Sequence, residues 1–219
     1  MQWNPMRLHF HQLLWVTLGF VLLLLCVRVY LTDSIERVFL LWNIFLAWIP
    51  YGISRYFVAD PERRSIGLLL IWWLFFPNAL YIVTDLIHIR ESALVPAWFD
   101  VVLIFAAGWL GLQLAFASFH RVECWLRFHL KPGQTHVVLI LILVTSSFGV
   151  YLGRFDRFNS WDLITNPVEL LSQVMHYIIH PLRNRETWGI TALLAMLYFI
   201  VYAYQWYWKE KRDHEDPVV

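Results

Sequence analysis

The sequence predicts an all-α integral membrane protein with six transmembrane helices and one amphipathic helix in the fifth loop. Of its 219 residues, 59% are hydrophobic and 15% are charged, whereas a soluble domain has roughly 25% charged residues. A helix needs about 20 apolar residues to cross the hydrocarbon core of a bilayer. The chain holds six such runs, at residues 13–31, 38–57, 66–83, 98–119, 137–152 and 190–208.

The charge balance indicates which classes of molecule the chain can bind. Its 17 Lys and Arg residues against 16 Asp and Glu residues give a formal net charge of +1, so no basic surplus is left to neutralise nucleic-acid phosphates. The high apolar content also excludes a disordered chain. We therefore expect membrane lipids, and no nucleic acid, among the partners.

The first span, two prolines and three charged residues are the features of the spans that need an explanation. The first span lacks a small-residue cleavage site behind it and is too long for a signal-peptide core, so we expect it to stay in the membrane. Pro50 in the second span and Pro77 in the third each remove a backbone hydrogen bond, which predicts a kink or a hydrogen bond from a neighbouring group. The charged residues within the six spans are Arg28, Arg55 and Asp100. Each lies near a span end, where its side chain is expected to reach water.

The fifth span carries two glycines in a pattern that favours close helix packing. Gly149 and Gly153 are four residues apart, so another helix can approach this face closely. That helix can belong to the same chain or to a second copy, and the sequence therefore allows a homo-oligomer.

The fifth loop is long enough to hold its own helix. Asn166 can cap a helix that begins at Pro167, with Glu169 three residues after the cap, and Pro181 is expected to end that helix near His180. One face of this helix is apolar and consists of Val168, Leu171, Val174, Met175 and Ile178. Such an amphipathic helix is expected to lie in the membrane interface.

The Lys and Arg residues in the connections and at the span ends predict the orientation. Ten of them flank the side that holds both termini, and seven, with Arg28 included, flank the other side. This excess predicts cytoplasmic N- and C-termini. We expect a single six-span domain at residues 1–208 and a short charged cytoplasmic tail at residues 209–219.

Under this topology, polar residues gather at the outer ends of the spans. In the third span, Asn78, Tyr81, Asp85 and His88 have the spacing of one α-helical stripe, which should face the bundle or a water-filled cavity. Asn43 lies at the same end of the second span. The two Asn side chains are favoured as interhelical hydrogen-bond partners. Asp85 and His88 either lie in a solvated loop past the helix end or belong to a functional site, and the sequence is compatible with both interpretations.

Histidines of the fifth loop have the spacing of metal ligands. His176 and His180 are four residues apart, so two imidazoles can bind one metal ion from adjacent turns. Asp85 and His88 are expected on the same side of the membrane, which makes the four side chains candidate ligands of a zinc ion. A solvated helix face is the favoured alternative, because the pair lacks the Glu of a zinc-protease motif and an interfacial helix needs a polar face.

Arginines of the fifth loop offer a second chemistry. Arg154, Arg157 and Arg185 can bind the phosphate or carboxylate of a lipid head group. In the favoured alternative, Arg154 forms a structural ion pair with one of three carboxylates: Asp85, Asp100 or Asp162.

Three stretches of the chain follow one recognisable pattern. They are LWNIFLAWIP at 41–50, WLFFPNALYIVTDLIH at 73–88, and GRF at 153–155 with NSWD at 159–162. With this pattern the chain resembles the domain of unknown function 1361, an uncharacterised family of bacterial integral membrane proteins, over about residues 40–162. The resemblance implies a location in the bacterial cytoplasmic membrane and no particular activity. It also implies a set of hallmark residues, without His176 and His180: Asn43, Pro50, Pro77, Asn78, Tyr81, Asp85, His88, Arg154, Asn159, Trp161 and Asp162.

Three functions fit this outer polar site. The first is an enzyme acting on a lipid or lipid-linked substrate, in which Asp85 and His88 serve as base or metal ligands and Arg154 binds an anionic head group. The second is a transporter or accessory subunit that relays protons or anions through the same cluster. The third is a structural assembly factor whose polar cluster only holds helices together. The residues assigned to the candidate catalytic site are Asp85, His88, Arg154, Asn78, Tyr81, Asp162 and Asn159.

Overall fold

The computed structural model describes residues 10–62, 65–89 and 94–215, and over these residues it contains helices and no strand. Within these ranges, six helices are long and apolar enough to cross a membrane, which confirms the predicted fold class. These six are α1 (Phe10–Thr32), α2 (Phe39–Ala59), α3 (Ile66–Tyr81), α4 (Ala97–His129), α5 (Pro132–Phe155) and α8 (Arg185–Glu215).

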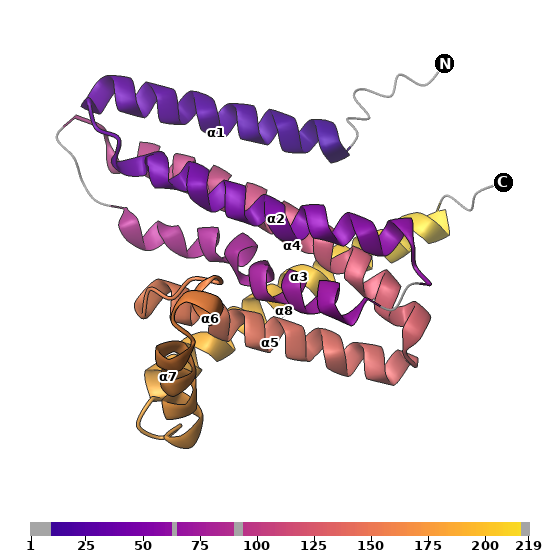
Figure 1. Ribbon diagram of the computed structural model, residues 1–219. Coiled ribbons are helices and arrows are strands. Elements are labelled where there is room, and N and C mark those ends of the chain that lie inside the picture. The colour runs from indigo at the N-terminus through magenta and orange to yellow at the C-terminus, as the bar shows by residue number, and fades with distance from the viewer. Residues whose placement is uncertain (1–9, 63–64, 90–93, 216–219) are drawn as a thin grey trace, which may run out of the picture.

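The six long helices run lengthwise through the molecule (Figure 1). The start of α1 and the end of α8 lie at the same end of the bundle, as six spans require. Two short helices, α6 (Asp162–Thr165) and α7 (Pro167–Ile179), lie at the opposite end, and α7 crosses the direction of the spans. We call this opposite end the loop end. The assignment of the termini to the cytoplasm stays a prediction.

Helix α4 is the centre of the bundle. It packs against α1, α2, α3 and α5, and 61% of its most apolar stretch is buried, against 17% for α8. Small residues on α4 explain this central position, since Ala107, Gly108 and Gly111 let neighbouring backbones approach closely. The outer faces of α1 and α8 are correspondingly free to contact lipid.

Gly111 marks the closest of these approaches and gives a testable prediction. A Cβ atom at this position would lie 2.7 Å from the carbonyl oxygen of Ala79 on α3. Because that obstacle is backbone, Gly111→Ala is expected to displace α3 and to lower the free energy of unfolding by about 1–3 kcal/mol. Unfolding of the purified protein in detergent, followed by circular dichroism, measures this loss. The matched control is Gly189→Ala on α8, where a Cβ would meet nothing within 4 Å. Equal stability of the two variants would contradict the close packing of α3 on α4.

The third span differs from the predicted single α-helix. Helix α3 ends at Tyr81 and continues as a 3₁₀ helix, η2 (Ile82–His88). The expectation of one α-helical stripe through His88 is therefore wrong, because a 3₁₀ helix has three residues per turn and turns its side chains differently. Asp85 is nevertheless fully buried. Its burial agrees with the expectation that this residue faces the bundle.

A buried ion cluster closes the loop end of α1 and α4. Arg28 Nε donates to Asp100 Oδ1 at 2.7 Å, and Arg37 Nη2 donates to Asp100 Oδ2 at 2.8 Å. Arg37 belongs to η1 (Glu36–Val38), the short 3₁₀ helix between α1 and α2. The exposed fractions of Arg28, Arg37 and Asp100 are 4%, 7% and 3%. The expectation that Arg28 and Asp100 reach water is wrong, because each finds its counter-charge inside the protein.

Candidate functional site

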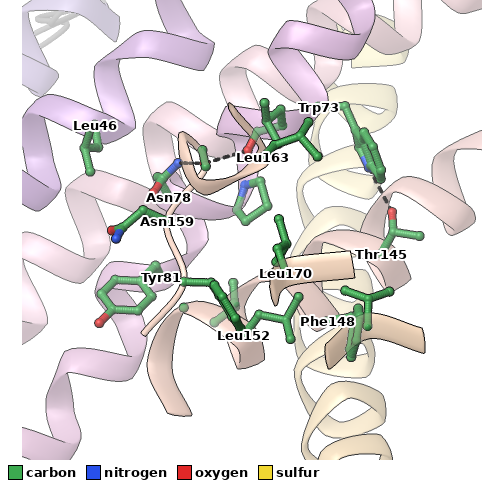
Figure 2. A pocket seen from close by; sticks show the side chains of 18 of the residues that line it. Leu46, Trp73, Asn78, Tyr81, Thr145, Phe148, Leu152, Asn159, Leu163 and Leu170 are labelled. Carbon is green, nitrogen blue, oxygen red and sulfur yellow. Dashed lines mark hydrogen bonds between the residues drawn. The ribbon is translucent and has the colours of Figure 1, made fainter. Parts of the chain in front are cut away.

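A cavity of about 500 Å³ lies at the loop end, between α2, α3, α5 and the segment that carries α6 and α7. Figure 2 shows Asn78, Tyr81 and Asn159 on one side of it, and Trp73, Thr145 and Phe148 on the other. Most of the lining is apolar, with Leu46, Leu152, Leu163, Leu170 and Val174 among the contributors. This size suits a small ligand or part of an acyl chain.

The polar side of the cavity is built around the proline of α3. Pro77 cannot donate a backbone hydrogen bond, and side chains supply bonds to nearby carbonyls instead. Asn78 Nδ2 donates to the carbonyl oxygen of Phe75 at 3.0 Å and to Ser160 Oγ at 2.9 Å. Ser160 Oγ in turn donates to the carbonyl oxygen of Leu74 at 2.8 Å. These bonds go to carbonyls just after that of Trp73, the one that Pro77 leaves without its helical donor, so the expected bond to the freed carbonyl stays a prediction. They attach the loop after α5 to α3.

Behind this polar side, Asp85 and Arg154 form a buried ion pair. Arg154 Nη2 donates to Asp85 Oδ1, and the two side chains are 7% and 1% exposed. Asn43 Nδ2 donates to the other carboxylate oxygen, Oδ2, at 2.8 Å. The structural ion pair considered for Arg154 is thus present, with Asp85 as its partner. Both oxygens of Asp85 are occupied.

The ring of Tyr81 covers the guanidinium group of Arg154. The Arg154 Cζ atom lies 4.0 Å from the centre of that ring, and Arg154 Nε donates to Thr84 Oγ1 at 3.0 Å. Tyr81 lines the cavity, whereas Arg154 and Asp85 do not. The ion pair therefore supports the cavity wall from behind.

Close packing of α5 on α3 fixes the floor of the cavity. A Cβ at Gly149 would lie 2.9 Å from Pro77 Cγ, and a Cβ at Gly153 would lie 3.5 Å from the Tyr81 ring. Both glycines thus serve a contact within one chain. The homo-oligomer stays a prediction, without support from this glycine pair.

Helix α7 covers the cavity and is held by Tyr177. The Tyr177 hydroxyl donates to Asp156 at 3.0 Å, and Trp188 Nε1 donates to the Tyr177 carbonyl oxygen at 3.1 Å. Burial raises the pKa of Tyr177 to about 12, so this hydroxyl keeps its proton at neutral pH. Burial also raises the pKa of the Asp156 carboxyl. The helix ends at Ile179 with His180 as its cap, as predicted.

The turn before α7 uses two of the predicted site residues for local structure. Asp162 Oδ2 accepts from the backbone N–H of Asn159 at 2.6 Å, and Asp162 Oδ1 accepts from Thr165 Oγ1 at 3.0 Å. Asn159 also lines the cavity. At the start of α7, Asn166 makes no side-chain bond to the helix backbone and instead donates to the Glu169 side chain. The cap position is as predicted, and the capping bond is not.

Among the described residues, the candidate zinc ligands do not come together at one point. His176 and His180 lie on the exposed side of α7 with ring centres 5.3 Å apart, and neither lines the cavity. Asp85 is bound to Arg154 and Asn43, and the side chain of His88 lies outside the described part of the chain. Among described residues, no group of three or more His, Cys, Asp or Glu side chains could hold a metal ion. The zinc site stays a prediction.

Three residues of the site were not predicted from the sequence as site residues. Ser160, which bonds Asn78, lies inside the NSWD string, and its position between two hallmark residues is the signal that could have found it. Trp73 Nε1 donates to Thr145 Oγ1 at 2.9 Å and joins α3 to α5 on the other side of the cavity. Nothing in the spacing of these two residues indicates that contact, because they are far apart in the chain.

Comparison with known proteins places the site within one family. A family model described as "Protein of unknown function (DUF1361)" matches residues 42–201. The match includes Asp85, Arg154 and every residue that lines the cavity, and it leaves α1 outside. No curated protein and no solved structure matches the chain. The resemblance seen in the sequence is confirmed, and the chain belongs to the DUF1361 family of proteins of unknown function.

Proposed function

We propose that the chain is a membrane protein that binds a lipid or lipid-linked molecule in the cavity at the loop end. The observation that carries this proposal is the combination of an apolar lining with a polar side formed by Asn78, Tyr81 and Asn159. A membrane lipid has the same two parts, an acyl chain and a polar head. The apolar side would take the part of the chain next to the head, and the polar side would take the head.

Access from the membrane supports a lipid as the occupant. Several residues that line the cavity are also exposed at the surface of the helices: Trp42 at 54%, Leu163 at 44%, Leu171 at 54% and Ile178 at 53%. The cavity is thus continuous with the apolar surface that a bilayer would cover. A lipid could enter sideways without crossing a polar surface.

The orientation is part of the same proposal. We place the protein in the cytoplasmic membrane with both termini in the cytoplasm, so that the cavity belongs to the outer leaflet. Support comes from the excess of Lys and Arg on the side of the termini.

Binding is the step that the enzyme and transporter hypotheses share. An enzyme that used Asp85 as the base toward a lipid-linked substrate would have to displace hydrogen bonds that both carboxylate oxygens accept. A relay would likewise have to break the Asp85–Arg154 pair. We therefore assign Asp85 and Arg154 to support of the cavity wall and assign ligand contact to the residues that line it.

Photocrosslinking tests this proposal. The full-length protein in nanodiscs is exposed to a fatty-acyl methyl ester with a diazirine in its chain, and labelled peptides are mapped by mass spectrometry. We expect labels to concentrate on the cavity-lining parts of α3, α5 and α7. Val174→Trp fills part of the cavity and is expected to lower this labelling about tenfold, the change that corresponds to 1.4 kcal/mol.

The matched control is Val168→Trp, the same substitution on the same helix. Val168 is 79% exposed and does not line the cavity, so labelling should be unchanged. The proposal would be overturned by labels spread uniformly over α1, α8 and the cavity, or by equal labelling of the two variants. Unfolding in detergent, measured for both variants, shows whether each is folded.

A further inference from the structure

The cavity wall is uncharged. Among the described residues that line it, none is Asp, Glu, Lys, Arg or His. The cation next to the wall, Arg154, is bonded to Asp85 and covered by the ring of Tyr81. A charged head group placed here would lose its water and find no free counter-charge on the wall, which is costly in an apolar site.

Most of the hydrogen-bonding groups that the wall leaves unpaired are acceptors. Three asparagines line the cavity, and each uses its amide NH₂ group on a protein acceptor. Asn43 Nδ2 donates to the Asp85 carboxylate, Asn78 Nδ2 to the Phe75 carbonyl oxygen, and Asn159 Nδ2 to the Arg157 carbonyl oxygen at 3.5 Å.

These partners also determine which way each amide faces. A carboxylate or a carbonyl oxygen can only accept a hydrogen bond, so the nitrogen of each amide must face it. One N–H of Asn43 is left over, and so are the amide oxygens of Asn43, Asn78 and Asn159. These oxygens accept no hydrogen bond from the described residues, and they make the wall rich in acceptors.

Tyr81 adds one group that can both donate and accept. Its ring packs against Arg154, while its hydroxyl makes no hydrogen bond with any residue in the described part of the chain. Figure 2 shows this hydroxyl on the same side of the cavity as Asn78 and Asn159. A ligand that bonds to this side must bring donors for the three amide oxygens.

We infer that the ligand is an uncharged lipid whose head carries hydroxyl groups, such as a diacylglycerol or a neutral glycolipid. This inference rests on the proposed lipid-binding function. Hydroxyl groups supply donors to the amide oxygens and an acceptor to the Tyr81 hydroxyl, and they bring no charge into the cavity. A phosphate head brings acceptors and a negative charge to a wall whose unpaired groups are mostly acceptors.

Competition against the diazirine methyl ester tests the inference. The full-length protein in phosphatidylcholine nanodiscs is labelled in the presence of diacylglycerol, monoglucosyl diacylglycerol or phosphatidic acid, all with the same acyl chains. We expect each of the two hydroxyl lipids to block cavity labelling at a concentration at least about fivefold below that of phosphatidic acid, the effect of roughly one hydrogen bond. Competition by one hydroxyl lipid alone identifies its head, glycerol or sugar, as the source of the hydroxyls.

Equal or stronger competition by phosphatidic acid would overturn the inference while leaving lipid binding intact. Failure of the methyl ester to label the cavity at all would instead overturn the proposed function, and the inference with it. The two failures are thus distinguishable.

Tyr81→Phe isolates the head-group contact. The variant keeps the ring over Arg154 and removes a hydroxyl without a described partner, so the fold should be preserved. We expect the preference for hydroxyl lipids over phosphatidic acid to fall about fivefold, and labelling by the methyl ester alone is measured on the same variant as the reference. Tyr30→Phe, at a position that is 86% exposed, is the control and should change neither quantity. An unchanged preference in Tyr81→Phe would contradict the role of this hydroxyl.

Discussion

Asp100→Asn is expected to lower the free energy of unfolding by roughly 3–5 kcal/mol or more, because it leaves buried guanidinium groups without their carboxylate. Arg28 and Arg37 both donate to Asp100, and all three side chains are buried. The cluster ties α1 and η1 to the start of α4. Unfolding in mixed detergent micelles, followed by circular dichroism, measures the loss.

A second variant separates loss of charge balance from loss of the cluster as a whole. Replacing Arg28 and Arg37 by Met together with Asp100 by Leu removes every charge at once, and such apolar replacements are often neutral or stabilising. We therefore expect the triple variant to be more stable than Asp100→Asn. Asp60→Asn, at an exposed carboxylate, is the single-site control. A stability for Asp100→Asn equal to that of Asp60→Asn would contradict the buried cluster.

Asp85→Asn is expected to cost about 3–5 kcal/mol as well, since it leaves Arg154 buried without its counter-charge. The wall of the cavity should loosen with it, because Arg154 supports the ring of Tyr81. The same unfolding experiment measures the stability. The double variant with Arg154→Met is expected to recover part of the loss, because it removes the unpaired cation.

The same pair of variants distinguishes a structural role of Asp85 from a catalytic one. If Asp85 supports the wall, lipid labelling and stability should fall together in Asp85→Asn and recover together in the double variant. If Asp85→Asn kept full stability and labelling, the assignment of this ion pair to support of the cavity would be wrong.

The spans were predictable from composition and periodicity, and so was part of the site. Asn78, Tyr81 and Asn159 line the cavity. Arg154 pairs with Asp85, one of the three carboxylates considered for it. These residues follow from the chain because local strings such as WLFFPNALYIVTDLIH place polar groups at a span end. Apolar run length reports where a helix crosses the membrane, and a polar group within it must find a partner.

The remaining features depend on contacts between distant parts of the chain. Arg28 and Asp100 are 72 positions apart, and no spacing rule links them. The change from α3 to η2 after Tyr81 occurs where this segment packs closely on Gly108 and Gly111 of α4, and a Cβ at either glycine would meet its backbone atoms. Hydrophobic periodicity predicts which faces of a helix are buried, but it does not predict which residues of different helices are in contact.

Native mass spectrometry of the full-length protein, released from mild detergent, tests the central claim most directly. We predict that one lipid stays bound per chain, that it is uncharged and carries hydroxyl groups, and that Val174→Trp loses it while Val168→Trp retains it. Lipid-free protein, a retained phospholipid, or equal retention by the two variants would contradict the assignment of the loop-end cavity as a site for a neutral, hydroxyl-bearing lipid.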